Sequence, residues 1–383
     1  MLTCQKARFA IPEGVHYLNC AYLSPLPETV EAAGVAGLRR KRVPVDFPPG
    51  SMFTDSDRLR GLFARLIGAR DPARVAILPA VSYGIAVAAR NVDARSGQNL
   101  VIAQDQFPSN VYAWRALARR RGLELRTVER PGGVPCAREW SARIQEAIDR
   151  DTAVVALPHV HWTDGARFDL ERIGVRARAV GAALVIDGSQ SVGALPFDVA
   201  GIQPDALVCA GYKWLLGPYS MCLGYFGPRF DGGEPLEETW IARQGSEDFQ
   251  HLVDYRERYR AGAARYDVGE RSNFILVPMQ IAALTLLLEW EPGRIQAYCR
   301  DLLAGLVAAL EASGVPVEEA GWRGEHILGI RLPARVDLGR LERDLRERGI
   351  HASLRGDALR ISPNVYNSSA DIDPLSEVLL AAL

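Results

Sequence analysis

Between residue 74 and about residue 226, short apolar segments alternate with amphipathic ones, and this alternation constrains the fold more than any other feature. Segments such as "NLVIAQ", "AVVALPHV" and "AALVIDG" have the length and the content of β-branched residues that are typical of buried strands. Each is followed by a stretch with helical periodicity, for example "VYAWRALARRRG" or "DLERIGVRARAVG". Continuous apolar strands separated by helices indicate an α/β fold, in which a mostly parallel sheet is covered on both faces.

The pattern changes towards the C-terminus, which predicts a second, smaller domain. A long helical stretch breaks at "EWEPGR", and it is followed by the strand "HILGIRLP", the helix "LGRLERDLRERG", two short strands and a last helix. We therefore expect an N-terminal segment over residues 1–25, a large α/β domain over 26–275 and a small α+β domain over 276–383.

Composition and charge exclude several classes of partner. The net charge is −1, and acids and bases are balanced along the chain, so neither nucleic acid nor an anionic membrane is an expected partner. No apolar segment approaches the length of a membrane span, and the N-terminus does not resemble a signal peptide. The six cysteines are scattered without C-x-x-C spacing, which is typical of a reduced, cytoplasmic protein.

Two charged residues follow buried strands, and together they indicate a chemical site. Asp187 ends "AALVIDG", and Lys213 follows "ALVCAGY". Ligands of parallel sheets bind beyond the carboxyl ends of the strands, where a carboxylate needs a cation or an N–H partner. The simplest interpretation is a salt bridge between the two residues. The alternative is pyridoxal phosphate, which needs a lysine amine for its Schiff base and a carboxylate that keeps its ring nitrogen protonated.

Other strand ends could complete such a site. Ser82 lies at the start of a helix, where it suits a phosphate or acts as a plain N-cap. Phe107 could stack on a cofactor ring or simply pack. His159 and His161 alternate along a strand end, but a metal needs a third ligand, so we expect no metal site and assign His161 either to the crevice or to a structural role.

The stretch "VIDGSQSVGALPFDVAGIQPDALVCAGYKWLLGPYSMCLGYF" resembles the core of the class V aminotransferase family of pyridoxal phosphate enzymes, and the similarity extends from "YLNCAYLSPLP" to "LRISPNVYN". This resemblance implies fold type I, with a mostly parallel seven-stranded sheet in the large domain. It also implies pyridoxal 5'-phosphate as cofactor, an amino acid as substrate, and a homodimer whose active sites are shared.

The resemblance also implies roles for individual residues. Lys213 would bind the cofactor covalently and move a proton, Asp187 would pair with the pyridinium nitrogen, and Arg360 would grip the substrate carboxylate. The remaining assignments are Gln190 and Ser189 near the phenolic oxygen; Tyr212, Ser82 and Tyr83 at the phosphate; Phe107, Asn110 and His161 beside the cofactor; Asn19 and Tyr22 on the substrate side; and Trp240, Arg271 and Asn273 in segments that cross to the partner.

Departures from the family pattern reduce the number of reaction types that the sequence allows. Desulfurases carry a reactive cysteine shortly before the carboxylate-binding arginine, whereas "GIHASLRGDALRIS" has none, so persulfide chemistry is not expected. "FPSN" and "HVHWTDG" resemble kynureninase, which however has aspartate at the position of Asn110 and an asparagine–tyrosine pair at His161 and Trp162. We expect an enzyme that acts on an amino acid through an external aldimine, with lyase or hydrolytic side-chain cleavage ahead of transamination and epimerisation.

Two readings from other classes remain. One is a binding module that keeps the fold without turnover. The other is a dinucleotide-binding domain, which the absence of G-x-G-x-x-G after the first strand disfavours.

Overall fold

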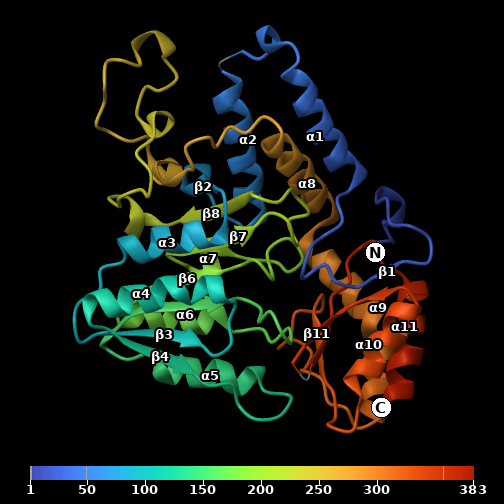
Figure 1. Cartoon of the computed structure of the whole chain (residues 1–383). Coiled ribbons are helices and arrows are strands. Elements are labelled where there is room, and N and C mark those ends of the chain that lie inside the picture. Colours follow the sequence, from blue (N-terminus) through green and yellow to red (C-terminus); the bar gives the residue numbers. More distant parts are fainter. Residues whose placement is uncertain (1, 49, 357) are drawn as a thin grey trace.

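The computed structural model describes residues 2–48, 50–356 and 358–383, and a seven-stranded sheet forms the centre of the described chain (Figure 1). Its strands lie in the order β2-β8-β7-β6-β5-β3-β4, and β8 is antiparallel to its neighbours while the other pairs are parallel. The strands are β2 (Val75–Leu78), β3 (Asn99–Ala103), β4 (Glu124–Val128), β5 (Thr152–Pro158), β6 (Ala183–Asp187), β7 (Ala206–Ala210) and β8 (Cys222–Phe226). This arrangement confirms the predicted mostly parallel α/β fold.

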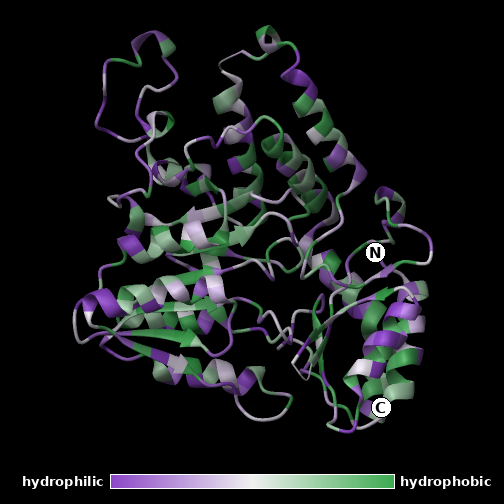
Figure 2. Cartoon of the chain, in the orientation of Figure 1, coloured by the Kyte–Doolittle hydropathy of each residue, from purple (hydrophilic) through white to green (hydrophobic). Residues whose placement is uncertain are grey.

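Helices cover both faces of this sheet because alternate side chains of each strand point to opposite sides. In β3, for example, Val101 joins one hydrophobic core and Ile102 joins the other. Figure 2 shows the strands as predominantly hydrophobic. The first core includes side chains of α2 (Ser51–Leu66), α5 (Ala137–Ala147), α6 (Leu170–Ala179), α7 (Val199–Ile202) and α8 (Leu276–Trp290), and the second those of α3 (Val81–Asn91) and α4 (Tyr112–Arg121).

A third core lies in the C-terminal part of the chain. The antiparallel strands β11 (Ser353–Arg355), β12 (Ala358–Ile361) and β9 (Leu328–Arg331) form a separate sheet in that order. The core contains side chains from this sheet and from α9 (Pro292–Ala312), α10 (Leu338–Glu347) and α11 (Ser369–Ala382). In Figure 1 these helices lie beside the central sheet, and β11 faces the loops that follow the strands of the central sheet.

The N-terminal segment connects the two parts. β1 (His16–Tyr17) pairs in parallel with β10 (Ile350–His351), and Asn19 forms a bridge with Ser362 just after β12. Helix α8 packs against α1 (Glu28–Arg40) and α2, so it lies with the large sheet rather than with the third core. The division of the chain into domains at residues 25 and 275 therefore stays a proposal.

None of the helices in the described part of the chain combines the length and the hydropathy that a bilayer span requires.

Candidate active site

Two adjoining cavities open at the carboxyl ends of the parallel strands. The first, the sheet-end cavity, measures about 350 Å³ and is lined by residues that follow β2, β3, β5, β6 and β7. The second, the arginine cavity, measures about 460 Å³ and lies between these loops, the N-terminal segment and the small sheet. Both are lined by Phe107, Trp162, Gln190, Tyr212, Lys213 and Tyr219. The strand ends that the sequence singled out therefore converge, and Lys213 faces both spaces.

Asp187 is a buried carboxylate in the sheet-end cavity. It is 7% exposed and accepts a hydrogen bond from the backbone N–H of Ser189 at 2.9 Å. Burial raises its pKa, while Ser189 and the charge of Lys213 act in the opposite direction. Among the described residues, Asp187 has no ion-pair partner within 4.0 Å, so the simple salt bridge with Lys213 does not form. A protonated ring nitrogen would supply the partner that this carboxylate lacks.

Lys213 is equally buried, at 7% exposure. Burial lowers its pKa to about 8; Asp187 opposes the shift, and Arg360 adds to it. The neutral amine is therefore accessible near neutral pH, as a nucleophile or a general base requires. The Nζ atom lies 5.1 Å from the ring centre of Phe107 and 5.7 Å from that of Tyr212.

The loop that carries Lys213 is held in a strained conformation. Leu216 and Ser220 are non-glycine residues with φ of 53° and 62°, which L-residues rarely adopt. The backbone N–H of Gly217 donates to the carbonyl of Gly211 at 2.8 Å, and the buried side chain of Gln280 donates to the carbonyl of Leu215 at 3.2 Å. These bonds fix the direction in which the lysine leaves the backbone.

Helix α3 presents its N-terminus to the sheet-end cavity. Its N-cap is Ala80, which offers no side-chain hydrogen bond, and Val81 and Ser82 line the cavity. The interpretation of Ser82 as N-cap is therefore wrong. A helix that begins without a side-chain cap leaves backbone N–H groups free for an anion, which suits the phosphate of the cofactor.

Arg360 projects from β12 into the arginine cavity and is 1% exposed. Its Nη1 donates to the carbonyl of Trp162 at 2.8 Å, and its Nη2 donates to Oδ1 of Asn19 at 3.3 Å. Asn19 also accepts a hydrogen bond from Ser353 at 2.9 Å, so it positions the arginine rather than lining the cavity. Tyr22 lines the cavity, and its role towards a substrate stays a prediction.

Gln190 and Ser189 line the sheet-end cavity, but their polar atoms already have partners. The amide of Gln190 donates to the carbonyl of Ala21 at 3.0 Å and accepts from Nε1 of Trp214 at 2.8 Å. The hydroxyl of Ser189 accepts from the N–H of Ala210 at 3.1 Å. These bonds tie the N-terminal segment and β7 to the end of β6.

Three predicted cofactor residues lie outside both cavities. The side chain of Asn110 accepts a hydrogen bond from Nε1 of Trp114 at 3.0 Å. His161 is buried, with its Nδ1 3.2 Å from Asp164, so it has the structural role that was the alternative. Tyr83 follows Ser82 on α3, but its hydroxyl is buried, and burial raises its pKa. All three point into the protein instead of the crevice.

Sequence reasoning missed several residues of the site. Trp162 and Tyr219 line both cavities, Ser109 lines the first and Arg355 the second. Trp162 follows His161 directly, and its ring contacts Phe107 edge-on at 5.6 Å between ring centres. The available signals were its position after a buried strand and its match to a tyrosine in the kynureninase segment that this stretch resembles.

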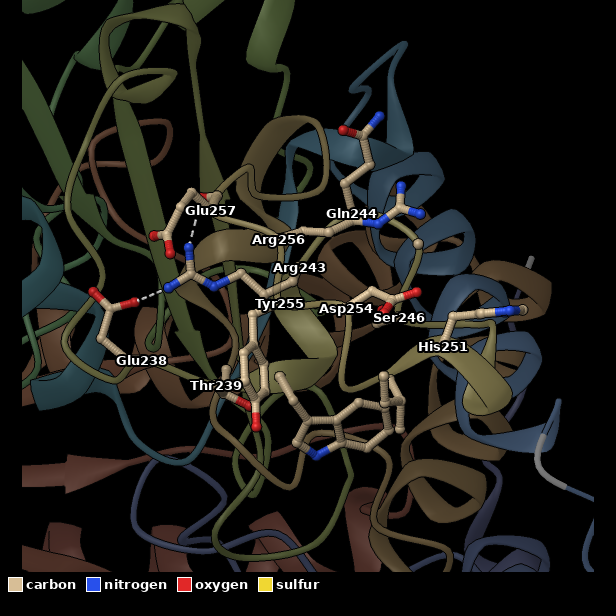
Figure 3. Close-up of a pocket in the computed structure, with 13 residues that line it drawn as sticks. Glu238, Thr239, Arg243, Gln244, Ser246, His251, Asp254, Tyr255, Arg256 and Glu257 are labelled. Atoms are coloured by element: carbon tan, nitrogen blue, oxygen red, sulfur yellow. Dashed lines mark hydrogen bonds and ion pairs between the residues drawn. The ribbon is translucent and has the colours of Figure 1, made fainter.

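The segment between residues 232 and 262 carries a separate cavity, shown in Figure 3. Arg243 donates to Glu238 and to the carbonyl of Glu257 there, and Trp240 is 43% exposed.

The other two candidates for crossing to a partner have intrachain contacts. Arg271 is 1% exposed and pairs with Asp267 at 3.0 Å, while Oδ1 of Asn273 accepts the first free N–H groups of α8.

Comparisons with known proteins show the family to which the chain belongs. The model of the family "Aminotransferase class-V" matches residues 51–226. A kynureninase of Pseudomonas fluorescens is 31% identical over 84% of this chain and 78% of its own length. The chain belongs to the class V aminotransferase family. An isopenicillin N epimerase of Streptomyces clavuligerus is 26% identical over 98% of this chain and 96% of its own length.

The fold has counterparts among solved structures. A cysteine desulfurase from Thermococcus onnurineus NA1 superimposes with a TM-score of 0.83, at 18% identity, over 100% of this chain and 98% of its own. The cystine C-S lyase C-DES, which has been solved with glycine covalently linked to its pyridoxal phosphate cofactor, superimposes with a TM-score of 0.83 at 18% identity, and each chain is fully covered.

Pyridoxal phosphate is the cofactor of this family, and the residues of this chain fit it. A buried carboxylate without an ion-pair partner, a buried lysine with a lowered pKa and an uncapped helix N-terminus surround one cavity. These features would suit the ring nitrogen, the aldehyde and the phosphate of the cofactor, in that order.

Proposed function

We propose that this family member removes the α proton of an amino acid with Lys213 and then cleaves the side chain, as a lyase or hydrolase of carbon–carbon or carbon–heteroatom bonds. The observation that carries the proposal is the position of Lys213 between two cavities. One contains Asp187 and the start of α3, and the other contains Arg360. A single amine can therefore serve the cofactor and the substrate in turn.

Each residue of the site has a separate proposed role in this reaction. Bound pyridoxal phosphate withdraws electron density from the substrate's α carbon. Arg360, held by Asn19 and Trp162, binds the α-carboxylate and orients the bond that breaks. Lys213 takes the α proton onto Nζ, because burial makes its neutral form accessible. Phe107 and Trp162, whose rings meet edge-on, form an aromatic wall shared by both cavities.

The absence of a thiolate supports side-chain cleavage without a persulfide. No cysteine lines the arginine cavity in the described chain. Cys20 is buried near Lys213, and burial raises its pKa to about 12; burial also raises the pKa of Cys222 in the sheet-end cavity. These thiols stay protonated and are poor nucleophiles. The similarity to kynureninase, whose name describes no sulfur chemistry, agrees with this proposal.

Epimerisation is the second candidate. The relative named isopenicillin N epimerase matches almost the whole length of both chains. An epimerase needs an acid opposite the base, and the phenols of Tyr22 and Tyr219 in the arginine cavity could provide it. Transamination needs only Lys213 and the cofactor, and no observation of this structure favours it over the other two.

The reactions are separated by incubating the enzyme with L-amino acids in deuterated water. Side-chain cleavage predicts a released side-chain product, whereas epimerisation predicts the D-amino acid with deuterium at the α carbon. Formation of the keto acid with conversion of the cofactor to its amine form would indicate transamination. Unlabelled, unchanged amino acid across a broad panel would contradict the proposal, because α-proton removal exchanges the proton with solvent.

We further propose that the chain forms a homodimer. The segment 232–262 projects from the large sheet (Figure 1) and exposes Trp240, Val253 and Tyr255, the last at 87%. Exposed apolar side chains on a projecting segment favour burial against a second chain.

A further inference from the structure

Two arginines, rather than one, face the arginine cavity. Arg355 lies on β11 and Arg360 on β12, and both line the cavity. Ser353 is the register partner of Arg360, and Arg355 follows two residues later on the same strand. Residues two apart on a strand share a face, so the arginines are diagonal neighbours whose Cβ atoms lie roughly 7 Å apart.

The charge of this arginine pair has no counterpart in the cavity. None of the eleven described residues that line it is an aspartate or a glutamate. Arg355 donates to the carbonyl of its neighbour Leu354 at 3.3 Å, and its buried Nε has no hydrogen-bond partner among the described residues. Arg360 likewise has a buried Nε without a partner there. Buried guanidinium nitrogens without a hydrogen-bond partner are costly, and an anionic ligand would relieve that cost.

The arginines also affect each other and the lysine. Burial and then the charge of Arg355 lower the pKa of Arg360 to about 10. Arg355 also contributes to the lowered pKa of Lys213. An anion bound to Arg355 would therefore reduce the repulsion among three cations that share one space.

We propose that the substrate of this site is an α-amino acid whose side chain carries a second anionic group, which Arg355 binds while Arg360 holds the α-carboxylate. This inference rests on the proposed function, since it assumes that Arg360 takes the α-carboxylate. Because the two arginines are diagonal neighbours on adjacent strands, we expect the second charge to lie a few atoms beyond the α carbon. Trp162 lies beside Arg355, 5.8 Å from guanidinium carbon to ring centre, and provides an apolar wall for the connecting atoms.

The test compares two ligands that differ only in charge. S-carboxymethyl-L-cysteine carries a side-chain carboxylate, and S-carbamoylmethyl-L-cysteine is its neutral amide of the same shape. Affinity for the holoenzyme is measured by titrating the cofactor absorption and by calorimetry. We expect wild type to prefer the carboxylate at least about tenfold, because hydrogen bonds to charged groups are stronger than neutral ones.

Variants then assign the preference to Arg355. Arg355→Gln should reduce it to less than about twofold while leaving the affinity for the amide nearly unchanged, and Arg355→Lys should retain part of it. Arg340→Gln, which removes the same charge from a side chain that is 77% exposed on α10, should keep the full preference.

Equal binding of both ligands by wild type, or a preference that survives in Arg355→Gln, would overturn this inference and leave the proposed function intact. If neither ligand perturbs the cofactor absorption, this inference fails as well, and the proposed function is then judged separately by α-proton exchange across the amino acid panel in deuterated water.

Discussion

At the residue scale, the proposed chemistry depends on one side chain whose burial is unfavourable. The chain has only three lysines, Lys6, Lys41 and Lys213, and Lys213 alone is buried. A buried ammonium loses hydration that Asp187 does not fully replace, which is why its pKa falls to about 8. The loss of hydration that destabilises the folded apoenzyme also favours the neutral, reactive form of the amine.

Replacing Lys213 should therefore stabilise the apoenzyme in a pH-dependent way. Because the pKa in the folded state, about 8, lies below the ordinary value of 10.5, the folded protein loses this proton at lower pH than the unfolded chain. The loss of folding stability caused by burying the charged lysine is therefore complete below pH 8, and it disappears as the pH rises to 10.5. We expect apo Lys213→Met to have a free energy of unfolding about 3 kcal/mol higher than that of the wild-type apoenzyme at pH 7, measured by urea denaturation. This difference should shrink towards zero as the pH approaches 10.5.

Lys41→Met, at an exposed site, is the control and should show no such pH dependence. A constant difference between Lys213→Met and wild type from pH 7 to 10.5 would mean that the lysine is not desolvated as described.

At the scale of elements, the site depends on two adjacent loops, after β6 and after β7. Gly193 has φ of 105°, and a Cβ atom built on it would lie 2.2 Å from the carbonyl oxygen of Trp214, next to Lys213. The turn after β6 thus packs directly against the backbone that carries the lysine. The position of Lys213 is therefore determined by both loops together.

Gly193→Ala should damage the site more than an equivalent change elsewhere. Gly97 also has a positive φ of 88°, but a Cβ there would have no neighbour within 4 Å. Gly97→Ala should lose roughly 1–2 kcal/mol from backbone strain alone. Gly193→Ala should lose more free energy of unfolding than Gly97→Ala, as measured by thermal unfolding. It should also bind less cofactor per chain. Equal losses and full cofactor loading in both variants would show that the contact with Trp214 does not position Lys213.

The strand ends were predictable from the sequence because an apolar run fixes where a buried strand stops and parallel strands end at one edge of the sheet. Asp187 and Lys213 were found in this way. The sequence could not tell which residue beyond a strand turns towards the cavity, because alternation ends with the strand; His161 was chosen where Trp162 lines the site. Arg355 was missed because only the register with β12 places it beside Arg360.

At the scale of the whole molecule, the substrate side of the site is assembled from three distant segments. Asn19 and Tyr22 come from the N-terminal segment, Trp162 from a strand end of the large sheet, and Arg360 from the small sheet. The pairing of β1 with β10 attaches the N-terminal segment to the C-terminal part. Relative movement of the two sheets would therefore change the position of Arg360 relative to Trp162.

Association of two chains is expected to cover the segment 232–262. Sedimentation equilibrium should give twice the chain mass of 42.0 kDa at micromolar concentration. Tyr255→Glu, which places a charge on a side chain that is 87% exposed, should weaken the dimer without unfolding the chain. A monomeric wild-type protein, or a variant that dimerises as tightly as wild type, would contradict the proposed role of this segment.

Reduction of the holoenzyme with borohydride, followed by mapping of the modified peptide by mass spectrometry, shows which lysine holds the cofactor. We expect one pyridoxyl phosphate group per chain, on Lys213, and none on Lys6 or Lys41. A stable adduct on either of the other two lysines, or an adduct that persists unchanged in Lys213→Ala, would contradict this assignment.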